Sequence, residues 1–109
     1  SHEMCSAFKN ICRLLAGESA VRTERGAVFA SRTEDDAVVV ILSEDSPIYG
    51  DTTSYPVSFR FTVNEPGIGK MKIESDAEYT VVHQEDDRIT LRTETTKDDA
   101  LFFRFSKDA

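Results

Sequence analysis

Apolar and polar residues alternate along most of this chain with a period of two, which is the period of a β-strand that has one buried face. The clearest example is residues 55–63, where every second position is apolar: Val57, Phe59, Phe61 and Val63. We therefore predict that this segment is a strand with these four side chains in the core. Ser58, Arg60 and Thr62 then point away from it.

Shorter segments of the same kind recur between polar turns, and they predict strands at residues 20–23, 27–32, 37–42, 70–74, 78–84, 88–94 and 100–106. Residues 37–42 (AVVVIL) form a continuous, largely β-branched apolar run, so we predict a central strand covered on both faces. The regular spacing of strands and turns favours a mainly β fold, either an antiparallel sandwich or a barrel-like meander of about seven short strands. The predicted core includes Val40, Phe59, Phe61, Leu91 and Phe103.

The N-terminal part of the chain follows a different period. Over residues 6–16, apolar side chains occur at the i, i+3, i+4 and i+7 positions of one helical face: Phe8, Ile11, Cys12 and Leu15. This pattern predicts a short amphipathic helix. Because a helix of about three turns is marginal alone, we expect it to pack on the sheet.

The chain has 109 residues, which suits a single domain, predicted over residues 5–109, and residues 1–4 (SHEM) resemble an expression-tag remnant. No apolar run approaches the roughly 18–20 residues that span a bilayer, so no membrane insertion is expected. Cys5 and Cys12 lack the spacing of a zinc site and are interpreted as free thiols of a reducing compartment. This predicts an intracellular, cytoplasmic protein.

Charge narrows the set of partners. Lys and Arg number 13 against 20 Asp and Glu, which gives a formal net charge of −7. A negative field repels phosphate backbones, so nucleic acid is not expected as a partner. The acids concentrate in the predicted turns 34–36, 85–87 and 98–99, where we interpret them as solvated side chains, with calcium binding left open.

No motif indicates catalysis, and none is specific enough to assign a family. His83 is the one histidine beyond residues 1–4, and a nucleophile–histidine pair needs a partner that the sequence does not identify. Residues 67–70 (GIGK) fail the pattern of a phosphate-binding loop, because no Ser or Thr follows the lysine and a strand is predicted after it. We interpret them as a hairpin turn. The sequence thus predicts a protein that is not an enzyme, with no catalytic residue, cofactor or metal, although carboxylate chemistry stays open.

The candidate binding surface is formed by outward positions on the predicted strands, where basic residues and one aromatic residue fall on one side. Its members are Arg60, Lys72, Arg92, Phe102 and Arg104. An aromatic side chain beside arginines is typical of a protein interface. We therefore predict a non-catalytic interaction or assembly domain that binds a protein partner or itself through an outward sheet face. The alternatives are a small β-barrel that binds a ligand or lipid phosphate through these bases, or simple cross-strand pairing with Glu74 and Glu94.

Overall fold

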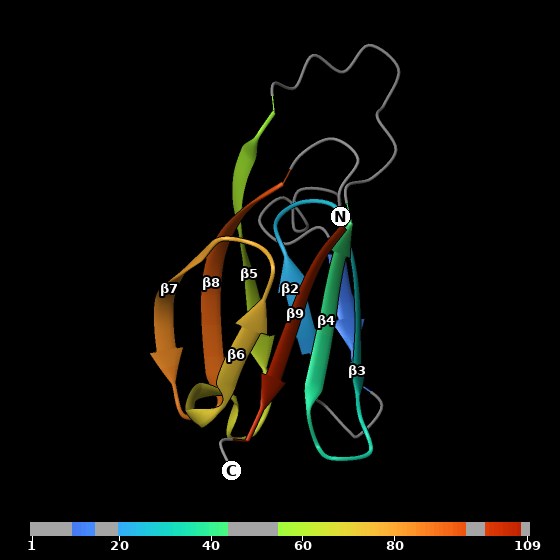
Figure 1. The fold of residues 1–109 in the computed structure, drawn as a ribbon, viewed down its shortest axis with the longest axis vertical. Coiled ribbons are helices and arrows are strands. Elements are labelled where there is room, and N and C mark those ends of the chain that lie inside the picture. Colours follow the sequence, from blue (N-terminus) through green and yellow to red (C-terminus); the bar gives the residue numbers. More distant parts are fainter. Residues whose placement is uncertain (1–9, 15–19, 44–54, 96–99, 108–109) are drawn as a thin grey trace, which may run out of the picture.

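Two antiparallel sheets packed face to face make up the part of the chain that the computed structural model describes, residues 10–14, 20–43, 55–95 and 100–107 (Figure 1). The five-stranded sheet has the order β1-β2-β5-β8-β7, with bounds Asn10–Arg13, Ala20–Thr23, Val57–Asn64, Arg88–Thr95 and Tyr79–Glu85. The four-stranded sheet has the order β3-β4-β9-β6, with bounds Ala27–Arg32, Val38–Ser43, Ala100–Ser106 and Lys72–Ser75. The predicted mainly β antiparallel sandwich is confirmed, and these sheets do not close into a barrel.

The core lies between the sheets and is built from the inward positions of the alternating strands. All five core residues predicted from the sequence are buried, and Phe59 is the most exposed of them at 6%. The rings of Phe61 on β5 and Phe103 on β9 meet across the sandwich with their centroids 4.8 Å apart. The core therefore joins the two sheets and leaves each with one outer face.

The predicted N-terminal helix is wrong, because residues 10–13 form strand β1 and the described residues contain no α-helix. β1 pairs antiparallel with β2, so that Ile11 lies opposite Arg22 and Cys12 opposite Val21. Ile11 is 53% exposed, whereas Cys12 packs against the core. Pairing with β2 gives this short segment backbone hydrogen bonds to a neighbouring strand, whereas a helix of about three turns is only marginally stable alone. Residues 8 and 15, which carried the rest of that prediction, lie outside the described residues.

The other eight predicted strands are present, each within two residues of its expected bounds. β4 is an interior strand of its sheet, between β3 and β9, as its apolar run indicated. The expected cover on both faces is not provided by the described residues, because Val39 and Ile41 stay partly exposed on the outer side. This uncovered side is one of the surfaces considered below.

The predicted hairpin turn at residues 67–70 is also wrong. β5 and β6 belong to different sheets, and the 3₁₀ turn η2, Ile68–Lys70, carries the chain from one to the other. The turn packs against the β7–β8 hairpin: the Gly69 N–H donates to the Asp86 carbonyl at 3.1 Å. A Cβ on Gly69 would lie 1.8 Å from the Glu85 carbonyl oxygen, so this close approach requires glycine.

The two lateral edges of the sandwich differ. At one edge β1 and β3 come together, and the Ala30 N–H donates to Cys12 Sγ at 3.1 Å. At the other edge, β6 and β7 each have one side that pairs with no described strand. β7 is exposed along its whole length and is broken by a bulge between Val81 and His83, a feature that discourages strand addition at a sheet edge.

Candidate functional site

The residues predicted to form one binding surface lie on two opposite faces. Arg60 and Arg92 are directly opposed on β5 and β8, in the five-stranded sheet. Lys72, Phe102 and Arg104 lie on β6 and β9, in the four-stranded sheet. The prediction that all five share one side is therefore wrong. Alternation shows which side of a strand a residue occupies, but it does not show to which of two sheets that strand belongs.

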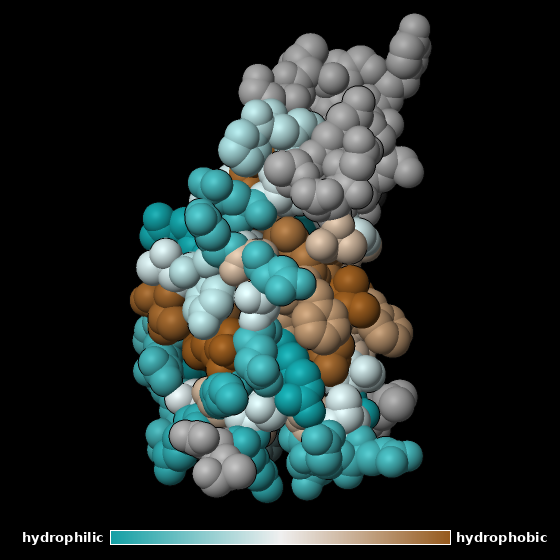
Figure 2. Space-filling view, viewed as in Figure 1, coloured by the Kyte–Doolittle hydropathy of each residue, from teal (hydrophilic) through white to brown (hydrophobic). Residues whose placement is uncertain are grey.

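The outer face of the four-stranded sheet carries three large apolar side chains in one cross-strand row. Phe29 on β3 lies opposite Ile41 on β4, and Ile41 lies opposite Phe102 on β9. Phe29 is 60% exposed and Phe102 is 44% exposed, and Ile41 between them is partly exposed. We call these three residues the apolar row. Figure 2 looks onto this face and shows hydrophobic surface extending across β9, β4 and β3.

Charged groups border the apolar row along β9. Arg104 lies one outward position from Phe102, and its guanidinium contacts Asp35 at 3.0 Å and Glu74 at 3.3 Å. A hydrogen bond from the Thr33 hydroxyl, assisted by backbone hydrogen bonding and by Arg104, lowers the pKa of Asp35. The cross-strand pairing of Arg104 with Glu74 was among the expected alternatives, and it is present.

A shallow groove of about 440 Å³ lies beside Phe102, between β9 and the link from β6 to β7. Asp76, Ala77 and Glu78 from this link line it together with Pro56, Glu94, Ala100 and Leu101. The Ser75 hydroxyl donates to the Phe102 carbonyl at 2.6 Å and accepts the Ala77 N–H at 3.0 Å, which fixes the link next to the strand. Phe102 therefore stands between the open face and a recess large enough for a partner's side chain.

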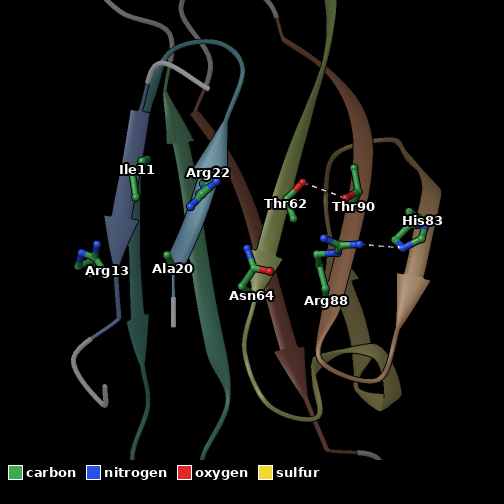
Figure 3. A pocket seen from close by; sticks show the side chains of 9 residues that line it. All are labelled: Ile11, Arg13, Ala20, Arg22, Thr62, Asn64, His83, Arg88 and Thr90. Atoms are coloured by element: carbon green, nitrogen blue, oxygen red, sulfur yellow. Dashed lines mark hydrogen bonds between the residues drawn. The ribbon is translucent and has the colours of Figure 1, made fainter. Parts of the chain in front are cut away.

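The outer face of the five-stranded sheet is polar and carries a second, larger groove of about 600 Å³, which we call the arginine groove (Figure 3). Its lining residues come from all five strands: Ile11, Arg13, Ala20, Arg22, Thr62, Asn64, His83, Arg88 and Thr90. Its floor is formed by shorter side chains on β2, β5 and β8, where Thr62 and Thr90 share a 2.8 Å hydrogen bond. The longer side chains form two banks, one from β1 and β2 and the other from β8 and β7.

The two banks of the arginine groove differ in their charge balance. On β7 and β8, Glu85 accepts hydrogen bonds from His83 and Arg88, both at 2.5 Å, and these bonds lower the pKa of Glu85, that from His83 contributing most. On β1 and β2, Arg13 and Arg22 contact no carboxylate among the described residues. Among the described residues, the first bank is therefore largely neutralised, whereas no carboxylate balances the positive charge of the second.

Farther along the same face, Arg60 is paired. Its guanidinium contacts Glu24 at 2.8 Å, and its backbone N–H donates to the same carboxylate at 2.9 Å. Partial burial opposes ionisation of Glu24, but these hydrogen bonds outweigh it and lower the pKa of Glu24. Arg92, directly opposite Arg60, contacts no carboxylate in the described parts of the chain.

The described residues contain no group of three or more His, Cys, Asp or Glu side chains placed to hold a metal ion. Of the acidic turns, Asp87 accepts the Gly67 N–H at 3.0 Å, and Asp35 and Glu85 are bonded to arginines. The third acidic turn, at residues 98–99, lies outside the described residues. Within the same limits, no helix has the length and apolar character needed to cross a bilayer.

The candidate site predicted from the sequence contained neither Phe29 and Ile41 nor any lining residue of the arginine groove. Residues 27–32 were predicted as a strand without assigned faces, and residues 37–42 as a strand covered on both faces, so the outward positions of Phe29 and Ile41 were overlooked. Arg13 was assigned to a helix, and Arg22 lies in a strand too short to show a period. The available signal for the first pair was an apolar residue at an outward position on each of two consecutive strands.

Comparison with models of protein families, with curated proteins and with solved structures finds no match for this chain. Because a fold alone does not define a function, the chemistry of the two outer faces carries the functional argument.

Proposed function

We propose that this domain is a non-catalytic protein-interaction module that binds through the outer face of its four-stranded sheet. The observation that carries the proposal is the apolar row, Phe29, Ile41 and Phe102, which is continuous across three strands and open to solvent. Single exposed apolar residues are common, but a contiguous exposed patch on a sheet favours an interaction surface.

The composition of this face supports a protein as the ligand. Binding interfaces combine an apolar, often aromatic centre with a polar rim, and arginine and aromatic residues carry much of the binding energy. Here two phenylalanines form the centre, and Arg104 with its two carboxylates forms one border. The groove beside Phe102 adds a recess into which a partner's apolar side chain can insert.

The partner we propose is a different protein rather than a second copy of this chain. Each copy carries a formal net charge of −7, and two such charges repel when they approach. Lys72, at the β6 end of this face, contacts no carboxylate among the described residues and is free to pair with an acidic group. A partner with an apolar centre and a neighbouring carboxylate would therefore complement this face.

The alternative of a β-barrel that binds phosphate through basic residues on one side does not fit this fold. The sheets form a sandwich, and the basic residues predicted to share one side, Arg60, Lys72, Arg92 and Arg104, are divided between its two outer faces. Lys72 and Arg104 lie beside an apolar surface, and Arg104 is already paired with carboxylates.

The test combines Phe29→Ala with Phe102→Ala and uses Val81→Ala with Val82→Ala as the matched control. Both variants remove exposed apolar side chains, the first from the apolar row and the second from the edge strand β7. Proteins captured from native lysate would be identified by mass spectrometry, and the affinity of each purified candidate would be measured with wild type and both variants.

We expect a partner whose affinity falls at least about tenfold for the Phe29/Phe102 variant and stays unchanged for the control, with both variants folded. The proposal is contradicted if every captured protein binds the Phe29/Phe102 variant as tightly as wild type. A loss only in the control variant would move the interface to β7. Concentration-dependent dimerisation, abolished in the Phe29/Phe102 variant, would replace the partner protein with a second copy.

A further inference from the structure

We infer that the arginine groove on the five-stranded sheet is a binding site for a compact ligand that carries two or more phosphate groups. This site lies on the outer face opposite the apolar row. Binding there would be a second function, and its test does not depend on the proposed protein interaction.

The sheet register brings the groove's donors into two neighbouring cross-strand rows. In one row Arg22, Thr62, Thr90 and His83 lie side by side, and in the next Arg13, Ala20, Asn64 and Arg88 do so. Neighbouring strands are about 4.8 Å apart and each residue adds about 3.4 Å along a strand, so Arg22 on β2 and Arg88 on β8, two strands away and in the next row, start from backbone positions about 12 Å apart. A ligand that spans the short floor side chains can therefore contact both banks (Figure 3).

The charge of the lining residues indicates that the ligand is an anion. Arg13 and Arg22 occupy adjacent strands on one bank, and neither contacts a carboxylate in the described parts of the chain. Such a concentration of unbalanced positive charge in a chain with a net charge of −7 favours an anionic ligand at this point. Arg88 contributes a donor on the other bank even though it shares its charge with Glu85.

The remaining donors favour phosphate. Guanidinium groups bind the oxygens of a phosphate in bidentate fashion, and phosphate offers more acceptor oxygens and more charge than a carboxylate of similar size. The Thr62 and Thr90 hydroxyls and the Asn64 amide supply neutral donors on the floor. Two positively charged positions on one bank and the guanidinium donors of Arg88 on the other suit two or more phosphate groups in one molecule.

The surroundings of the groove favour a compact ligand over a nucleic acid strand. The nine lining residues include no Phe, Tyr or Trp, and the one aromatic ring, that of His83, is hydrogen-bonded to Glu85, so the groove has no row of rings on which successive bases could stack. A longer phosphodiester chain would also meet carboxylates beyond the groove: Glu24 at Arg60, Glu94 on β8, and the turn at Asp86 and Asp87. The groove volume of about 600 Å³ is in the range of small-molecule sites.

Calorimetric titration with inorganic tripolyphosphate tests the site. The variant is Arg13→Gln with Arg22→Gln, and the matched control is Lys70→Gln with Lys107→Gln, which removes the same charge from exposed positions outside the groove. We expect the control to bind as wild type does and the arginine variant to bind at least about tenfold more weakly. Amide shift perturbations in wild type, centred on Thr62, Asn64 and Thr90, give a readout that does not depend on the folding of any variant.

Several outcomes would overturn the inference: no binding of tripolyphosphate, equal weakening in both variants, or shift perturbations elsewhere. Equal affinity for citrate would show that the site selects charge and not phosphate. Tighter binding of a single-stranded oligonucleotide, lost in the arginine variant, would replace the compact ligand with a nucleic acid.

Phosphatidylcholine vesicles with and without a phosphoinositide bisphosphate identify the source of the phosphates. If the inference holds, binding to phosphoinositide vesicles that exceeds tripolyphosphate binding and requires Arg13 and Arg22 assigns a lipid headgroup. Binding of tripolyphosphate without vesicle binding assigns a free ligand.

Discussion

The two outer faces of the sandwich cover the same core, but they expose different kinds of side chain to water. On the five-stranded sheet, the outward positions of the middle strands hold Thr62, Asn64 and Thr90 between arginines. On the four-stranded sheet, the corresponding middle positions hold Ile41 and Phe102, with Phe29 beside them. Polar side chains suit the first face to water, whereas large exposed apolar side chains do not suit the second, which is why we assign the second to a protein partner.

The comparison is sharpest between neighbours on a single strand. Phe103→Ala removes a fully buried ring that contacts Phe61, so the free energy of unfolding should fall by about 3–5 kcal/mol. Phe102→Ala, one residue away and 44% exposed, should change it by about 0.5 kcal/mol or less. Chemical denaturation of both variants measures the difference. Similar losses would show that Phe102 is covered in the folded chain and would remove the basis of the proposed interface.

Substitutions in the 3₁₀ turn η2, which connects the two sheets, should give the next largest loss of stability. Gly69→Ala places a Cβ against the Glu85 carbonyl, so the 3₁₀ turn or the β7–β8 hairpin must move, at a cost of about 1–3 kcal/mol. Gly67 has φ of +78° but open space around its Cα, so Gly67→Ala should cost only about 1–2 kcal/mol from the backbone. Thermal unfolding should place the Gly69 variant below the Gly67 variant. If the Gly69 variant instead unfolded at the higher temperature, the β7–β8 hairpin would shift at little cost to accommodate the added methyl group.

The sequence predicted more of the fold than of the surfaces, and particular residues show why. Alternation identified inward residues such as Phe61 and Phe103, because a period of two depends only on the local strand. It also placed Phe102 outward, and that prediction is confirmed. The division of Arg60 and Arg104 between opposite faces depends on long-range pairing, β5 with β8 and β9 with β4, which no local pattern encodes.

The N-terminal strand β1 shows the same limit of local sequence patterns, here for the type of element itself. The apolar positions Ile11 and Cys12 fit a helical face and a strand edge equally well over so short a segment. Pairing with β2 decides between them, and this pairing creates the bank that carries Arg13 and Arg22. The candidate phosphate site therefore could not have been predicted before the topology was known.

Each outer face also contains one exposed carboxylate whose pKa is lowered by its hydrogen bonds, Asp35 near the apolar row and Glu85 in the arginine groove. Thr33→Val and Arg104→Gln should each raise the pKa of Asp35, because each removes a group that lowers it. Likewise His83→Ala and Arg88→Gln should each raise the pKa of Glu85. Carboxyl ¹³C chemical shifts followed through a pH titration measure all four values.

The sign of the pH dependence follows from the direction of these shifts. A carboxylate with a lowered folded pKa stabilises the native state above its unfolded pKa of about 4, and this contribution is lost as the pH falls through the folded value. Thr33→Val and His83→Ala should therefore reduce the loss of stability in acid, by small amounts because both carboxylates are exposed. If either variant instead left its carboxyl pKa unchanged, the hydrogen bond on that face would not persist in solution.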